Sequence, residues 1–173
     1  EKGDVVFDVG AFIGGFTLAI LDKAKRIIAV EPDPFNYLLL SYNTKEAGNV
    51  TIIKKAAYDF NSSLLLYQVD DPTSSSLLKP TTKIKKQITI EASRIDALML
   101  ELGVEKIDFL RIDAEGAEPE VLEGTPLCRV KKVAVDCSPE RFGKTTVFEV
   151  LKILLSAGFK CQVRDYMVYA YNY

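Results

Sequence analysis

The sequence contains no histidine among its 173 residues. This absence excludes the side chain that most often serves as a general base near neutral pH, together with Ser-His-Asp triads and metal sites built on imidazole. Proton transfer must therefore use a carboxylate, lysine, tyrosine or cysteine. Cys128, Cys137 and Cys161 are far apart and form no CxxC pair, so we expect reduced thiols rather than a disulfide framework or a structural zinc site.

Long apolar runs and an excess of positive charge are also missing. No segment approaches the ~20 apolar residues that span a bilayer, and no secretory leader opens the chain, so we expect a cytoplasmic protein. The formal net charge is -2, which argues against a nucleic-acid partner because phosphates attract a positive field. The length predicts a single domain over residues 1–173. Because the chain begins at Glu1 without a methionine, a missing preceding segment stays open.

Apolar periodicity predicts alternating strands and helices over the first third of the chain. Residues 5–7, 26–30 and 50–53 are short apolar, β-rich runs. A helix is expected between the first two, and Asp33 followed by Pro34 is a good start for a second helix. We expect the core-facing side chains of this second helix to be Phe35, Leu38, Leu39 and Tyr42. The βαβαβ order predicts parallel strands with right-handed crossovers, which is half of a doubly wound α/β sheet.

The second half of the chain interrupts this alternation and then resumes it. Residues 59–86 become polar and lysine-rich, which predicts an antiparallel excursion or a loop. Ser93 and Asp96 resemble a capping box for a short helix. Strands follow at 107–112 and 132–135, with helices at 117–123 and at the apolar face Val147, Val150, Leu151, Leu154 and Leu155. Alternation around Asp165 and Tyr166 predicts a C-terminal antiparallel hairpin.

The turn over residues 8–14 lies where open parallel sheets bind ligands, at the carboxyl end of the first strand. Gly10 would let the backbone approach a ligand, and Gly14 would let the next helix pack closely. Asp8 stands where a dinucleotide fingerprint has its first glycine, and its carboxylate would repel a pyrophosphate but suits an ammonium group. The structural alternative is that Asp8 caps the turn and the glycines only permit it.

An acidic residue ends the second predicted strand. Glu31 follows Gly10 by 21 residues, which matches the spacing at which a carboxylate accepts hydrogen bonds from ribose hydroxyls. Pro32 would stiffen the chain directly after it. A solvated glutamate at a strand end is the alternative. The pattern supports binding of a nucleoside without distinguishing between cofactors.

Three ordered motifs, FDVGAFIG at 7–14, VEPDP at 30–34 and LRIDAEGAE at 110–118, together resemble FkbM-type S-adenosylmethionine-dependent methyltransferases. The segments SSSL at 74–77 and LEG at 122–124 are similar to weaker family features. The resemblance implies a mostly parallel, seven-stranded class I methyltransferase sheet of Rossmann-like type, with the terminal hairpin expected above. It also implies methylation of a hydroxyl, often on a sugar or natural product.

The resemblance assigns roles to particular residues of this chain. It matches Thr17 with a hydroxyl in the first helix and places Ala57, Tyr58 and Asp59 at the adenine edge. The implied residues for binding S-adenosylmethionine, or S-adenosylhomocysteine as product, are Asp8, Gly10, Ala11, Gly14, Thr17, Glu31, Pro32, Ala57, Tyr58 and Asp113. Two positions depart from the family: Arg111 stands where the family usually has lysine, and Asp136 stands where it often has glutamate. The planar guanidinium of arginine does not reproduce an ammonium group, so a role specific to that lysine does not carry over to Arg111.

The acceptor-activating chemistry is expected just past the strand at 107–112, at Asp113 first and Glu115 second. A partly desolvated carboxylate with a raised pKa can accept a hydroxyl proton as the new bond forms. The alternative is that Asp113, Glu115 and Glu118 cap the following helix. We expect no metal, since the chain has no histidine and shows no third clustered ligand.

Several readings of the sequence stay open. The same fold and Glu31 suit a nicotinamide-binding oxidoreductase module, which Asp8 and the hairpin oppose, and a non-catalytic cofactor-binding or interaction protein keeps the fold without turnover. The lysines Lys79, Lys83, Lys85 and Lys86 are interpreted as a solvated strand edge. The tyrosines Tyr166, Tyr169, Tyr171 and Tyr173 are interpreted as half-buried strand residues. The acceptor and the oligomeric state are not determined by these residues.

Overall fold

A computed structural model describes residues 2–68, 76–78 and 84–172. Its main sheet has seven strands in the order β3-β2-β1-β7-β8-β10-β9. The strands are β1 (Asp4–Val9), β2 (Ala24–Val30), β3 (Val50–Ile53), β7 (Ile107–Ile112), β8 (Val130–Asp136), β9 (Lys160–Arg164) and β10 (Met167–Tyr171). The first five in spatial order pair in parallel, and β10 runs antiparallel to both β8 and β9. The predicted sheet and terminal hairpin are confirmed.

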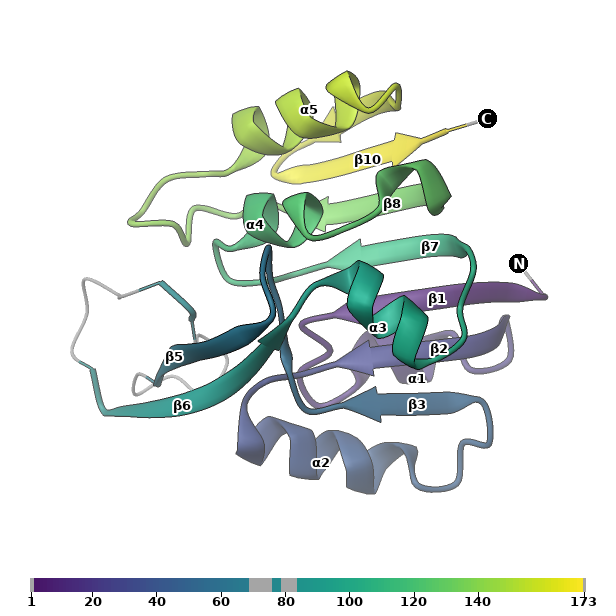
Figure 1. Ribbon diagram of the computed structural model, residues 1–173, viewed down its shortest axis with the longest axis vertical. Coiled ribbons are helices and arrows are strands. Elements are labelled where there is room, and N and C mark those ends of the chain that lie inside the picture. Colours follow the sequence, from purple (N-terminus) through teal and green to yellow (C-terminus); the bar gives the residue numbers. More distant parts are fainter. Residues whose placement is uncertain (1, 69–75, 79–83, 173) are drawn as a thin grey trace.

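Helices cover both faces of this sheet, as a doubly wound fold requires (Figure 1). The helices are α1 (Gly15–Ala19), α2 (Pro34–Thr44), α3 (Ile95–Glu101), α4 (Glu118–Glu123) and α5 (Val147–Ser156), with a 3₁₀ turn at Leu127–Arg129. Residues of α3, α4 and α5 form one core cluster with Ile28 and Val30, whereas Leu40 of α2 packs with Ala29 on the opposite face. The alternation of side chains along β2 therefore divides the core into two layers.

The predicted antiparallel excursion is present as a small second sheet. It contains β4 (Ala56–Ala57), β5 (Ser62–Gln68) and β6 (Lys86–Ser93) in the order β4-β6-β5. β5 and β6 pair antiparallel, and they extend beyond the carboxyl ends of the main strands (Figure 1). Lys86 begins β6, while Lys79, Lys83, Ser74 and Ser75 lie outside the described residues. The excursion places additional side chains beside the edge where ligands bind.

The start of α2 is as predicted, but its buried face is not. Asp33 caps the helix by accepting hydrogen bonds from the amides of Phe35 and Asn36. The predicted core face is largely exposed to solvent, with relative exposures of 59% for Phe35, 63% for Leu38 and 67% for Tyr42. The buried residues are Asn36, Leu40 and Thr44. This prediction was wrong because a less apolar stripe of α2 faces the sheet, where Leu40 packs with Ala11 and Ala29.

The end of β6 corrects a second prediction. Ser93 is the last residue of the strand and not a helix cap; its hydroxyl donates to Asn61 Oδ1, and Arg94 precedes α3 without a side-chain cap. Asp96 instead accepts hydrogen bonds from the Arg94 guanidinium. The capping box is therefore wrong, and α3 is held by its buried residues Ile95, Leu98 and Met99.

The last helix follows its predicted pattern with one exception. Val150 and Leu154 of α5 are buried, and Leu155 at the edge of the apolar face is exposed. None of the helices in the described part of the chain has the length and apolar composition needed to cross a membrane.

Candidate functional site

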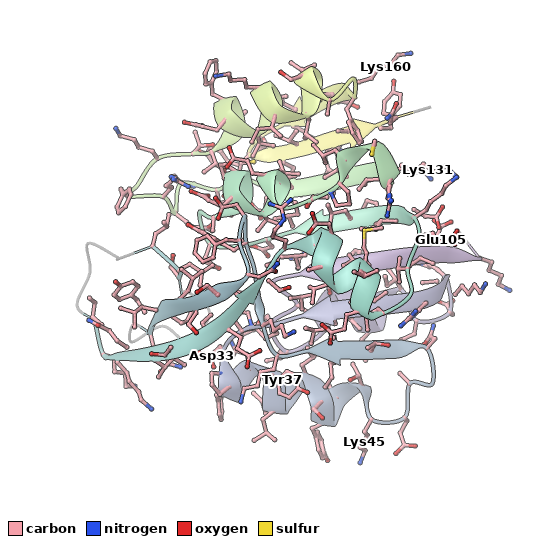
Figure 2. The ribbon with its side chains drawn as sticks, viewed as in Figure 1. Asp33, Tyr37, Lys45, Glu105, Lys131 and Lys160 are labelled. Atoms are coloured by element: carbon pink, nitrogen blue, oxygen red, sulfur yellow. The ribbon has the colours of Figure 1, made fainter. Side chains whose placement is uncertain are left out.

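A cavity of about 330 Å³ opens at the carboxyl ends of β1, β2 and β7. Its size falls within the range of pockets for small molecules, which is roughly 300 to 1,000 Å³. Seven of the residues expected from the sequence line it: Gly10, Ala11, Glu31, Pro32, Ala57, Asp113 and Glu115. Figure 2 shows Asp33 on this side of the sheet, whereas Glu105 and Lys131 lie at the opposite ends of the strands. The switch-point prediction therefore places the pocket correctly.

The glycines of the first turn are required by the protein's own packing. Gly10 has a φ of +74°, and a Cβ there would lie 1.8 Å from the carbonyl oxygen of Asp113. Its amide donates to the carbonyl of Val30, which ties the turn to β2 as well. Gly14 does not line the cavity, and a Cβ there would lie 2.9 Å from a methyl group of Leu40. Glycine is therefore needed at position 10 because the backbone of Asp113 lies so close to it. The reason expected from the sequence was instead the close approach of a ligand.

Asp8 lies beneath the cavity and not in its lining. Its side chain is fully buried, accepts a hydrogen bond from the Thr17 hydroxyl at 2.6 Å and pairs with Arg111 at 3.0 Å. Thr17 is buried as well, so the two residues tie α1 to β1. A direct contact of Asp8 or Thr17 with a cofactor stays a prediction. The geometry shows Asp8 acting on the pocket through Arg111.

Glu31 lines the cavity from the end of β2 and is only 5% exposed. Its two oxygens accept hydrogen bonds from the amides of Phe12 and Asp33, both at 2.9 Å. Burial raises the pKa of Glu31 to about 7, against the effect of these two hydrogen bonds. The Asn36 side chain is a third hydrogen-bond partner of this carboxylate, which offers about four acceptor positions in total. Glu31 is therefore held in place and keeps acceptor capacity for a ligand hydroxyl.

The predicted adenine edge is only partly in the cavity. Ala57 lines it together with two residues of the excursion that sequence reasoning missed, Leu66 of β5 and Leu77. Tyr58 is not in the lining, and its ring packs edge-on against Phe60. The carbonyl of Asp59 accepts a hydrogen bond from Arg94. Roles for Tyr58 and Asp59 at an adenine stay predictions, and the apolar wall beside Ala57 comes from the excursion.

Three carboxyl groups cluster beyond the ends of β7 and β8, and two of them, those of Asp113 and Glu115, line the cavity. Asp113, Glu115 and Glu140 each place an oxygen within 4.8 Å of the others. Burial raises the pKa of Glu115 to about 8, with further contributions from Glu140 and Asp113. It raises the pKa of Glu140 to about 7, and the pKa of Asp113 is also raised by burial although the Arg111 charge opposes the shift. The expectation that no third acidic group clusters here was wrong.

Glu140 was missed because it is far away in sequence. It lies after β8, in the segment that leads to α5, and only the pairing of β7 with β8 brings it beside Glu115. The preceding Asp136 accepts hydrogen bonds from the amide and hydroxyl of Ser138. The signal in the sequence that could have identified Glu140 is its place shortly after a predicted parallel strand, at the edge of the sheet where ligands bind.

The turn over residues 113–118, called the acidic turn below, is fixed by hydrogen bonds within it and with neighbouring segments. Glu118 is fully buried, and its carboxylate accepts from the amides of Ala114 and Gly116 and from the Thr146 hydroxyl. Glu118 therefore binds the amides of the turn that precedes α4, and α4 itself has no side-chain cap, so the capping alternative was wrong. The carbonyl of Glu115, which has a φ of +52°, accepts from the Ser76 hydroxyl at 2.9 Å. These contacts hold the backbone that carries Asp113 and Glu115.

Comparisons with known proteins agree with this architecture. The model of the methyltransferase FkbM domain matches residues 8–161. The hexuronic acid methyltransferase AglP of Haloferax volcanii is 28% identical over 124 residues, covering 72% of this chain and 51% of that protein. The methyltransferase sdnD of Sordaria araneosa is 29% identical over 154 residues, with coverages of 69% and 59%. The chain spans about half the length of such relatives.

A solved structure has the same fold. Methyltransferase FkbM from Methylobacillus flagellatus KT aligns with a TM-score of 0.70 at 18% identity, covering 99% of this chain and 44% of that one. Fibrillarin of Aeropyrum pernix, solved with bound S-adenosyl-L-methionine, aligns with a TM-score of 0.61 at 16% identity, with coverages of 98% and 67%.

Proposed function

Because the chain belongs to the FkbM family of methyltransferase domains, we propose that it transfers a methyl group from S-adenosylmethionine to a hydroxyl of a sugar or small natural product. The observation that carries this proposal is a single cavity with Glu31 at one end and the acidic turn of Asp113 and Glu115 at the other. One end suits a nucleoside and the other suits an acceptor that must lose a proton.

The residues at the first end fit the cofactor. The Glu31 carboxylate is fixed by two backbone amides and can accept hydrogen bonds from ribose hydroxyls. Val30, Ala57 and Leu66 offer the apolar surface that an adenine ring needs. The cofactor is S-adenosylmethionine, which becomes S-adenosylhomocysteine after the methyl transfer. When bound, S-adenosylmethionine supplies a methyl group that its sulfonium makes electrophilic.

The protein's own contribution is positioning and proton removal. Hydrogen bonds with Ser76 and Glu118 fix the backbone of the acidic turn beside the cavity. Positioning of reacting groups supplies a large part of the rate enhancement in reactions of this kind. A carboxylate of raised pKa in a half-buried site can take the proton of the attacking hydroxyl. Asp113 and Glu115 are the candidates for this role.

The relatives support the class of acceptor. AglP acts, by its name, on a hexuronic acid, which is a sugar with several hydroxyls. We extend this to the present chain as an acceptor of sugar type, with a small natural product as the wider class. An acceptor screen with radiolabelled S-adenosylmethionine, run over sugars, uronic acids and polyols, tests it; label transferred only to amines or to no hydroxyl would contradict it.

The cofactor is tested separately by thermal shift with S-adenosylhomocysteine and with NAD. A ligand at 100 times its Kd stabilises the folded state by about 2.7 kcal/mol. S-adenosylhomocysteine should raise the Tm by several degrees, and NAD should not. Glu31→Ala should abolish the shift, with exposed Glu46→Ala as the matched control. A shift with NAD alone would favour the nicotinamide-binding alternative.

A further inference from the structure

The guanidinium of Arg111 joins the cofactor turn to the acidic turn. Nη1 donates to Asp8 Oδ1 and to the carbonyl of Gly10, both at 3.0 Å, and Nη2 donates to Asp113 Oδ2 at 2.5 Å. Arg111 stands opposite Asp8 in the register of β1 and β7, so its planar fork spans both strand ends. The ring of Phe16 lies 5.6 Å from the guanidinium carbon.

This arrangement leaves Asp113 committed to an ion pair. The other carboxylate on the guanidinium, Asp8, is fully buried and also bound by Thr17, so it cannot turn toward the cavity. Asp113 does line the cavity, with its side chain 28% exposed. Removing a proton from an acceptor would require Asp113 to give up or share its bond with Arg111. A fixed anion is better suited to face the positive charge of a methyl donor.

Glu115 differs from Asp113 in its partners. Among the described residues, no donor hydrogen-bonds to its carboxylate, and the charges that raise its pKa are those of Glu140, Asp113, Glu118 and Asp136. The nearby cation Arg141 donates instead to the Gly116 carbonyl and the Glu120 carboxylate. Burial and these charges raise its pKa to about 8, which is close to the operating range of a general base. Its backbone is held by Ser76, so the carboxylate is positioned without being neutralised.

We propose that Arg111 is a positioning residue that commits Asp113 to the methyl donor, and that Glu115 is the catalytic residue that takes the acceptor's proton. The proposal rests on the proposed function, since it assigns roles within that reaction. The acceptor oxygen forms a bond to the methyl carbon, and the carbon–sulfur bond breaks with its electron pair remaining on sulfur. The hydroxyl proton passes to the Glu115 carboxylate, and the products are a methyl ether and neutral S-adenosylhomocysteine.

The role of Arg111 is tested by calorimetry with two probes, S-adenosylmethionine and S-adenosylhomocysteine, which differ by the positive charge. Asp113→Asn should lower the affinity ratio of the first over the second about fivefold, as expected for one partly solvated charge pair. Arg111→Gln should make the ratio fall more steeply with decreasing pH than it does in the wild type, because Asp113 then faces Asp8 and Asp136 without its cation and its pKa rises further. Arg111→Lys, which keeps the charge and loses the fork, should lower the ratio by a smaller factor.

The matched control is Arg94→Gln. Arg94 also bonds a carboxylate and a carbonyl, those of Asp96 and Asp59, but it does not line the cavity. Its replacement should leave the affinity ratio unchanged. A purely structural role for Arg111 would weaken both probes equally in Arg111→Gln and in Arg111→Lys, and that result would overturn the positioning role.

The role of Glu115 is tested by the pH profile of kcat with an acceptor from the screen. In the wild type, kcat should rise with pH to a plateau, with a midpoint at or below about 8 because the sulfonium favours the ionised carboxylate. Glu115→Gln should lower kcat about 100-fold and remove this limb, while Asp113→Asn should keep it. A limb lost in Asp113→Asn and kept in Glu115→Gln would overturn the assignment. Wild-type protein that binds neither probe would instead refute the proposed function.

Discussion

Replacement of Gly10 by alanine should destabilise the protein more than its left-handed backbone alone would require. Gly10 has a φ of +74°, a conformation that costs an L-residue roughly 1 to 2 kcal/mol. The added Cβ would also lie 1.8 Å from the carbonyl oxygen of Asp113, where β1 and β7 are neighbours. The contacted oxygen belongs to the backbone directly after β7, and the Asp113 amide donates to the Val9 carbonyl, so it cannot move aside as a flexible side chain would.

The chain offers a matched control for this effect. Gly143 has the same φ of +74°, and a Cβ there would meet nothing within 4 Å. Gly143→Ala should therefore cost only the conformational strain, about 1 kcal/mol. Overpacking typically adds 1 to 3 kcal/mol, so Gly10→Ala should cost about 3 kcal/mol or more. At roughly 2 to 4 °C per kcal/mol for a domain of this size, its Tm should fall by about 6 to 12 °C.

Chemical denaturation of both variants, with equal m-values as the check on two-state behaviour, measures the difference. S-adenosylhomocysteine binding should weaken in Gly10→Ala, because the Asp113 backbone must shift, and be unchanged in Gly143→Ala. Equal stability losses in the two variants would refute the reasoning, since the contact with Asp113 would then have no measurable cost.

Three further predictions follow from buried polar groups. Glu118→Ala should cost about 3 kcal/mol or more in denaturant unfolding, because it leaves two turn amides and a buried hydroxyl without their acceptor. Exposed Glu123→Ala should cost little, and equal costs would contradict the role of Glu118 in holding the turn. Thr17→Val, nearly isosteric, should cost about 1 to 3 kcal/mol by removing the donor from buried Asp8; a neutral result would show that Arg111 alone satisfies this carboxylate. The stability of the unliganded protein should fall as pH rises from about 4.5 to 8, because folded Glu115, Glu31 and Glu140 keep protons that the unfolded chain has already released. Glu115→Gln should make the loss of stability between about pH 5.5 and 8.5 in unfolding curves smaller without abolishing it, and an unchanged loss would count against the raised pKa of Glu115.

Local patterns in the chain predicted most of the architecture. Alternating apolar periods, the Asp33-Pro34 helix start and the terminal hairpin describe interactions between residues close in sequence, and each appears in the structure. Such patterns were insufficient for α2, because its most apolar face is exposed to solvent. The buried stripe packs Leu40 against Ala11 and Ala29, a tertiary contact that no spacing within the helix encodes.

The sequence by itself determined the order of the motifs, the spacing from Gly10 to Glu31 and the carboxylates beyond the strand at 107–112, because each is a property of consecutive residues. Tertiary structure decided how those groups are used. Arg111 reaches Asp8 on the adjacent strand, and Glu140 approaches Glu115 from the segment after β8. Charge and burial act over a few ångströms of space, so the division of roles between Asp113 and Glu115 depends on neighbours that chain order does not reveal.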